Sequence, residues 1–241
     1  MSANWRKAVG WALAITVVSP TVARATPPSP QAIVKACDEA DNVAQCERLL
    51  EAEQIKQFPS VAAREGRVLR LKDRAGGAPV ELRDEGDPNA ATGGEYRAYA
   101  FWDYWPQKKS AVVSVTTQAR DHYLVVDLDR GTRTQVPAEP ILAPYGKRFL
   151  VADLCDTQCA NLIQIWRFDR DRLVRKRTFK PAEKWYEADV AWRDAATLAI
   201  EYSVAAPRRR LAEPGELVLL RAQPRLLKLS DSEWAVDETG P

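Results

Sequence analysis

Apolar positions recur at helical spacing only near the start of the chain, over residues 31–60. Ile33 and Cys37 share one face of the first part of this segment, and Leu50 belongs to an apolar stripe in the second part. Asn42 stands three residues before Gln45, which is the arrangement of a capping box at the start of a helix. The segment is therefore predicted to be helical, with a second helix beginning near Asn42.

The two cysteines of this segment restrict its geometry. A single straight helix would hold Cys37 and Cys46 about 13 Å apart, whereas a disulfide requires Cα atoms within about 7 Å. If the two cysteines pair, the helix must break near Asp41 and Asn42. The break would fold the segment into a helical hairpin.

From residue 61 to residue 241 the pattern changes to strand-like runs separated by turn residues. Four stretches repeat one strand–turn–strand unit: 67–84, 123–136, 162–179 and 216–230. Two further strands precede each of the last three stretches: 96–102 and 110–116, 141–142 and 148–153, 188–192 and 197–203. The pattern predicts three antiparallel four-stranded units and an N-terminal half unit. Residues 232–238 are a candidate strand that could complete the half unit.

A short motif gives these units a possible family. Within residues 140–152, the run Ala143-Pro144-Tyr145-Gly146-Lys147-Arg148 resembles the Ser-Pro-Asp-Gly-Lys-Arg blade signature of TolB-like and WD40-like β-propellers. Tyr145 replaces the usual Asp, which leaves the turn type open. The resemblance extends over residues 96–203, and the chain looks like a family of exported bacterial proteins of uncharacterised function with blade-like β repeats.

The resemblance implies a mainly β fold of antiparallel four-stranded blade-like units, as a small or incomplete β-propeller, with an N-terminal helical hairpin. Propellers usually have four to eight blades, so three and a half units do not decide whether the ring closes. An open stack of sheets, with the helices covering one edge, is the alternative. Blades of this kind imply a binding scaffold and specify no particular chemistry.

The first 25 of the 241 residues have the pattern of a signal peptide. Basic Arg6 and Lys7 precede an apolar run over 8–18, and Ala23-Arg24-Ala25 is a small-x-small cleavage site. The run is too short for a bilayer span, which needs about 20 residues. Residues 26–30 would be a linker. We therefore expect a periplasmic or secreted protein with no membrane span after cleavage.

Charge and cysteine content narrow the function further. Removal of the leader would leave 32 basic and 33 acidic residues, and this near-neutral balance gives no general reason to bind nucleic acid. Four cysteines in an exported chain suggest two disulfides. Their closeness in sequence favours the pairs Cys37–Cys46 and Cys155–Cys159.

The pair Cys155 and Cys159 is neither a typical redox motif nor a typical metal site. Redox motifs usually separate the cysteines by two residues at a helix N-terminus, and here three residues separate them before a strand. A zinc site needs more ligands than Cys37, Cys46 and His122 supply at this spacing. We expect a disulfide that closes the loop between the second and third strands of a blade, with no metal and no cofactor.

No catalytic residue can be assigned from the sequence. His122 is the only histidine, and no Gly-x-Ser-x-Gly nucleophile motif accompanies it. Paired carboxylates could hydrolyse glycosides, but most acidic residues stand at predicted turns, which favour Asp for backbone reasons. These residues are Asp127, Asp129, Asp153, Asp156, Asp169, Asp171, Glu183, Glu187 and Asp189.

Two segments are candidate binding surfaces. The aromatic run over 95–109 has rings at both strand parities, which suits an inner strand between neighbouring blades. At its end, before Pro106, Tyr104 and Trp105 could form an exposed platform for sugars or a partner protein. The basic loop Arg208, Arg209 and Arg210 could dock onto an acidic partner.

The sequence favours an exported, non-catalytic interaction protein of the bacterial envelope, whose partner is an unidentified protein or envelope glycan. One alternative is a hydrolase that acts on an envelope polysaccharide or ester. A second alternative is an inhibitor of a hydrolase such as lysozyme, which the cysteine-stapled helical segment would support.

Overall fold

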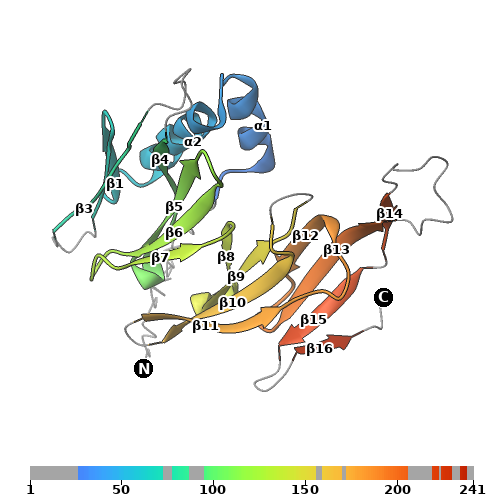
Figure 1. Ribbon diagram of the computed structural model, residues 1–241. Coiled ribbons are helices and arrows are strands. Elements are labelled where there is room, and N and C mark those ends of the chain that lie inside the picture. Colours follow the sequence, from blue (N-terminus) through green and yellow to red (C-terminus); the bar gives the residue numbers. More distant parts are fainter. Residues whose placement is uncertain are drawn as a thin grey trace, which may run out of the picture.

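The computed structural model describes residues 27–72, 78–86, 95–155, 159–169, 172–205, 219–222 and 224–229, together with the backbone of 234–237. The predicted leader lies outside the described residues. The chain is mainly β, with four antiparallel sheets and two helices near the N-terminus (Figure 1).

The helical segment forms the predicted hairpin. Helix α1 spans Pro30–Asp38 and helix α2 spans Val43–Gln57. The Asn42 side chain caps α2 by accepting from the Gln45 N–H at 2.9 Å, and the Gln45 side chain accepts from the Asp41 N–H at 2.9 Å. The break brings the Cα atoms of Cys37 and Cys46 to 4.6 Å, and the two residues form a disulfide. The prediction of a broken helix joined by a disulfide is confirmed.

The β region consists of four sheets, each built mainly from strands that are consecutive in the chain. The first sheet contains β1 (Ala62–Glu65), β2 (Val68–Leu71) and β3 (Val80–Arg83). The second contains β4 (Arg97–Trp105), β5 (Ser110–Thr117), β6 (His122–Asp127) and β7 (Arg133–Val136). The third contains β8 (Pro140–Leu142), β9 (Arg148–Asp153), β10 (Leu162–Asp169) and β11 (Arg172–Phe179). The fourth contains β12 (Tyr186–Trp192), β13 (Thr197–Ala205), β15 (Arg225–Leu229) and β16 (Trp234–Asp237), and β14 (Leu219–Arg221) pairs with β13.

The last strand does not complete the first sheet. Strand β16, inside the predicted segment 232–238, pairs with β15 of the fourth sheet. The expectation that it completes the N-terminal half unit is therefore wrong. The third strand of the first sheet is β1, which turns into β2 through Gly66 in a left-handed conformation. Both pairings are local, and short connections minimise the entropy lost on closing a loop.

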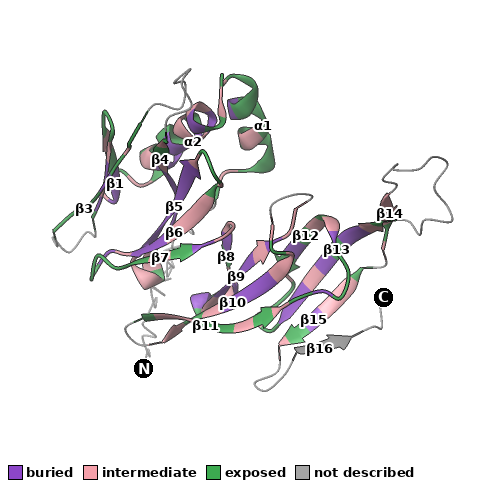
Figure 2. Cartoon of the chain, in the orientation of Figure 1, coloured by how far each residue is buried: buried purple, intermediate pink, exposed green. Residues whose placement is uncertain are grey.

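The sheets pack face to face in chain order. One apolar cluster joins the first sheet to one face of the second, another joins the opposite face of the second to the third, and another joins the third to the fourth. Strand β5 is consequently buried on both faces (Figure 2). Helix α2 packs against β4, which is an edge strand of the second sheet. In Figure 1 the first and fourth sheets lie at opposite ends of the molecule, and the described residues form no closed barrel or ring.

A β-bulge in β4 changes which rings share a face. Phe101 pairs with Val113 and Asp103 pairs with Val112, so Trp102 is an extra residue in the strand. Beyond the bulge, Tyr104 joins Phe101 in the first cluster, whereas Trp105 joins Trp102 in the second. Strict alternation along the run 95–109 would place Tyr104 on the same face as Trp102, and the bulge makes that expectation wrong.

Candidate functional site

The predicted aromatic platform is not exposed. Tyr104 is 6% exposed and Trp105 is 3% exposed. The bulge directs Tyr104 into the core between the first two sheets, and the Trp105 ring lies 5.3 Å from the Phe149 ring of the third sheet. Both residues nevertheless line the wall of a surface cavity. The basic loop Arg208, Arg209 and Arg210 lies outside the described residues.

This cavity is the candidate functional site, and it has a volume of about 880 Å³. It is lined by residues of β4, β8 and β12, each of which is both the first strand and an edge strand of its sheet. The first strands of three successive sheets therefore line one cavity. The side chains that define its chemistry are Asp103, Trp105, Glu139, Tyr145, Asp189 and Trp192.

Two indole hydrogen bonds hold these edges together. Trp102 of β4 donates its Nε1–H to Glu139, the residue before β8, at 2.9 Å. Trp192 at the end of β12 donates its Nε1–H to the Ile141 carbonyl of β8 at 2.9 Å. The relative placement of the three edge strands therefore depends on directional polar contacts as well as on apolar packing.

Asp103 is a buried acid in an otherwise apolar strand, with only 6% of the residue exposed. Its carboxylate accepts from the backbone N–H of Tyr104 at 2.7 Å and from the indole N–H of Trp105 at 2.9 Å. The pKa of Asp103 is raised to about 6, chiefly by burial and to a smaller extent by the charge of Glu139, against these two hydrogen bonds, which lower it.

Glu139 is half-buried beside Asp103. Burial raises the pKa of Glu139, and the hydrogen bond from Trp102 acts in the opposite direction. The charge of Glu139 in turn raises the pKa of Asp103. Asp189 lines the same cavity from β12 and is exposed.

Tyr145 lies at the rim in an unusual backbone conformation. Its φ of 68° and ψ of 2°, with the Gly146 N–H bonded to the Ala143 carbonyl at 3.0 Å, define a type II turn. That position favours glycine, and a bulky residue there is strained. Tyr145 is also 83% exposed, which leaves a large ring in solvent at the mouth of the cavity.

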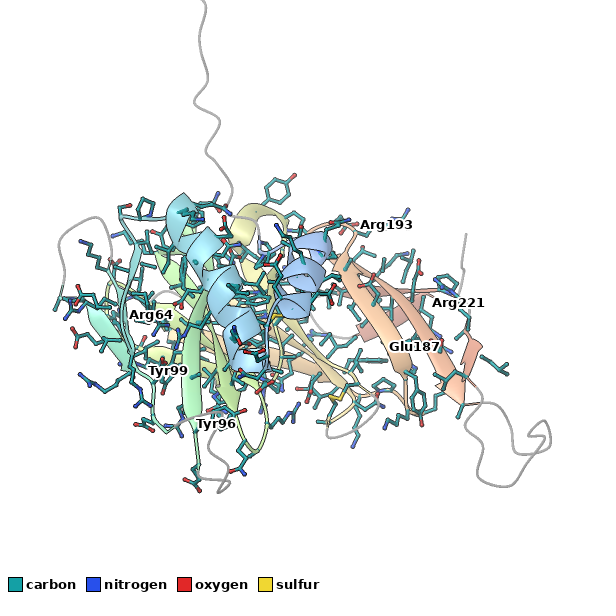
Figure 3. The ribbon with its side chains drawn as sticks, turned by 90° about the horizontal axis from the view of Figure 1, so that it is seen from above. Arg64, Tyr96, Tyr99, Glu187, Arg193 and Arg221 are labelled. Carbon is teal, nitrogen blue, oxygen red and sulfur yellow. A yellow bond between two sulfur atoms is a disulfide. The ribbon has the colours of Figure 1, made fainter. Side chains whose placement is uncertain are left out.

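A different acidic cluster lies under helix α2 and is fully paired. Glu51 of α2 is 2% exposed and receives hydrogen bonds from Arg48, Arg64 and the Phe101 N–H. Both arginines also bond the Tyr99 carbonyl, and Figure 3 shows Arg64 and Tyr99 beside this helix. This cluster joins α2 to the first two sheets and is structural.

The remaining predicted residues have structural positions. Cys155 and Cys159 form a disulfide, with Cα atoms 5.5 Å apart, between β9 and β10, as predicted. His122 begins β6, and burial lowers its pKa. Asp127 caps a turn by accepting from the backbone N–H groups of Asp129 and Arg130. Within the described part of the chain, no cluster of three or more His, Cys, Asp or Glu residues could hold a metal ion.

Four residues of the cavity were not predicted as site residues from the sequence: Asp103, Glu139, Tyr145 and Trp192. A signal did exist for Asp103, because an aspartate inside the run Phe-Trp-Asp-Tyr-Trp stands in a strand whose neighbours all require burial. Nothing in the sequence places Glu139 or Trp192 beside it, because the contact between three edge strands depends on how the sheets stack. Of the acidic residues noted at turns, the structure brings Asp189 into the cavity.

Comparison with known proteins adds no relative: no protein-family model, curated protein or solved structure matches the chain. Among the described residues, no helix is long and apolar enough to cross a membrane.

Proposed function

We propose that this protein is an exported ligand-binding protein of the bacterial envelope, periplasmic or secreted, built from blade-like β units in the manner of a small, incomplete propeller. It binds its ligand in the cavity between β4, β8 and β12. The two disulfides support an oxidising compartment, and the signal-peptide pattern of residues 1–25 supports export.

The observation that carries this proposal is the convergence of three leading edge strands on one hollow. Propellers have a central channel, and the first strand of each of the last three sheets lines the hollow here. The volume of about 880 Å³ falls in the range of small-molecule sites, which is about 300–1,000 Å³. Exposed Tyr145 and half-buried Trp192 supply aromatic contact surface, and the carboxyl groups supply hydrogen-bond acceptors.

The experiment is native mass spectrometry of the oxidised, leaderless protein incubated with low-mass and glycan fractions of a bacterial envelope. We expect a retained ligand that is lost in Tyr145→Ala and Trp192→Ala. The matched control is Tyr96→Ala, because Tyr96 (labelled in Figure 3) is a tyrosine that does not line the cavity. No retained ligand, or a ligand kept by both cavity variants, would contradict the proposal.

A hydrolase is the second candidate, and the Asp103–Glu139 pair favours it. A carboxyl group whose pKa is raised to about 6 can act as a general acid close to neutral pH, and glycosidases use a pair of carboxyl groups. This function predicts turnover of fluorogenic glycosides or esters that falls by about 100-fold or more in Asp103→Asn. Asp169→Asn, in an exposed ion pair, is the control. Turnover that is absent, or equal in both variants, would exclude this candidate.

A further inference from the structure

We propose that the ligand of the cavity is a small organic cation, a molecule that carries a protonated amine or a quaternary ammonium group. This inference rests on the proposed function and specifies its ligand class. It follows from the charge of the lining, from the aromatic residues at the rim and from the absence of an ion pair to Asp103 or Glu139 among the described residues.

The lining of the cavity is acidic. Asp103, Glu139 and Asp189 contribute three carboxyl groups, and no lysine or arginine is among the described residues that line it. An anionic ligand would meet repulsion from these groups. A cationic ligand would gain charge-assisted hydrogen bonds, which are roughly twice as strong as bonds between neutral groups.

The aromatic residues of the rim fit the same class. Electron-rich ring faces attract ammonium groups, and tryptophan and tyrosine do so best. Elsewhere in the chain the protein supplies its own cations to such rings: Lys108 lies 5.0 Å from the Phe168 ring, and Arg225 lies 5.5 Å from the Tyr202 ring. Within the described residues, no lysine or arginine stacks on Tyr145 or Trp192.

A cation would also relieve an electrostatic cost inside the site. Among the described residues, Asp103 and Glu139 accept hydrogen bonds from neutral N–H donors and form no ion pair, and the charge of Glu139 raises the pKa of Asp103. Burial makes the ionised form of each group less favourable and raises the pKa of both, so a positive charge in the cavity would stabilise them. An ammonium group in the cavity would supply that charge.

The test compares ligands of matched shape and different charge. Isothermal titration calorimetry at neutral pH would use choline and its uncharged analogue 3,3-dimethyl-1-butanol, with spermidine as a longer cation. We expect choline or spermidine to bind at least about tenfold more tightly than the uncharged analogue. Asp103→Asn and Glu139→Gln should each weaken cation binding by about tenfold or more, whereas Asp169→Asn should change it by less than about twofold.

Two variants and a folding check keep the inference falsifiable. Circular dichroism establishes whether each variant is folded. If Asp103→Asn does not fold, the binding comparison is made with Glu139→Gln alone. Equal affinity for choline and the uncharged analogue would overturn the inference. Unchanged cation affinity in both cavity variants, or no binding of either cation at about 10 mM, would also overturn it. A neutral ligand recovered from the envelope fractions, and lost in Trp192→Ala, would overturn the cation while leaving the binding function in place.

Discussion

Glu51 and Asp103 are both buried carboxylates, with 2% and 6% of each residue exposed, yet the protein treats them in opposite ways. Glu51 accepts from Arg48 at 2.7 Å and from Arg64 at 2.7 Å and 3.1 Å. Asp103 accepts only from neutral N–H groups among the described residues. Glu51 is thus neutralised by the fold, and Asp103 is not.

The difference separates a structural acid from a site acid. A buried charge without a partner is costly, and a fold that brings two arginines to Glu51 has the means to pair its acids. At Asp103 the surrounding elements bring a second acid, Glu139, and an open cavity. We infer that Glu51 stabilises the fold. Lack of a cation is not sufficient for a ligand role, because burial also raises the pKa of Glu47 of α2. Asp103 lines the cavity and Glu47 does not, and we infer that Asp103 contacts a ligand.

The largest effect should come from Glu51→Gln. Removing this charge leaves Arg48 and Arg64 with Asp84 as their remaining acidic partner, so we expect a loss of about 3 kcal/mol in the free energy of unfolding. Asp103→Asn should not lower it at neutral pH, because no buried cation loses its partner and the raised pKa of Asp103 means that its ionised carboxyl is unfavourable in the fold. Urea unfolding monitored by tryptophan fluorescence measures both, and equal losses would remove the distinction between the two acids.

The second-largest effect is the pH dependence of stability that arises from Glu47 of α2. Like Asp103, this carboxyl group has little compensation from a neighbouring positive charge. Its pKa is raised to about 7, chiefly by burial, while the hydrogen bond from Thr116 acts to lower it. The folded state therefore holds a proton that the unfolded state releases between about pH 4.5 and 7. Stability should fall as the pH rises through this window, and Glu47→Gln should gain roughly 2–3 kcal/mol above it.

Thermal unfolding at a series of pH values measures this dependence. Asp103→Asn should remove a similar part of the pH dependence, at lower pH, because the pKa of Asp103 is raised from 3.8 to about 6. A variant Glu47→Gln with the pH profile of the natural chain would show that Glu47 stays ionised in the fold.

The disulfides should have a moderate effect. Loop-closure entropy gives about 2 kcal/mol for Cys155–Cys159 and about 3 kcal/mol for Cys37–Cys46, because the second pair closes a longer loop. Replacing Cys155 and Cys159 with Ser should lower the melting temperature and retain ligand binding. Lost binding at unchanged stability would instead indicate a reactive cysteine pair.

The smallest effect separates stability from binding at the rim. Tyr145→Gly removes a bulky side chain from a left-handed conformation and should stabilise the fold by about 1 kcal/mol. The same change removes a ring from the cavity mouth and should weaken binding of the ligand. A stabilised variant with unchanged affinity would show that Tyr145 is outside the site.

The sequence predicted local structure well and missed contacts between sheets. The strand order from 96 to 203 and the helix break at Asn42 follow from periodicity, turn residues and disulfide geometry, which are local signals. The position of Tyr104 was wrong because one inserted residue, Trp102, reverses the alternation and leaves no mark in the sequence. The partner of β16 and the proximity of Asp103 to Glu139 depend on sheet order and stacking, which periodicity does not encode.

The most direct measurement is a carbon NMR titration of the Asp103 carboxyl with and without choline. The account predicts a pKa of about 6 in the free protein and a lower pKa when choline is bound, because a neighbouring cation favours the ionised form. An unchanged pKa in the choline-bound protein would contradict the claim that the ligand supplies a positively charged partner for Asp103.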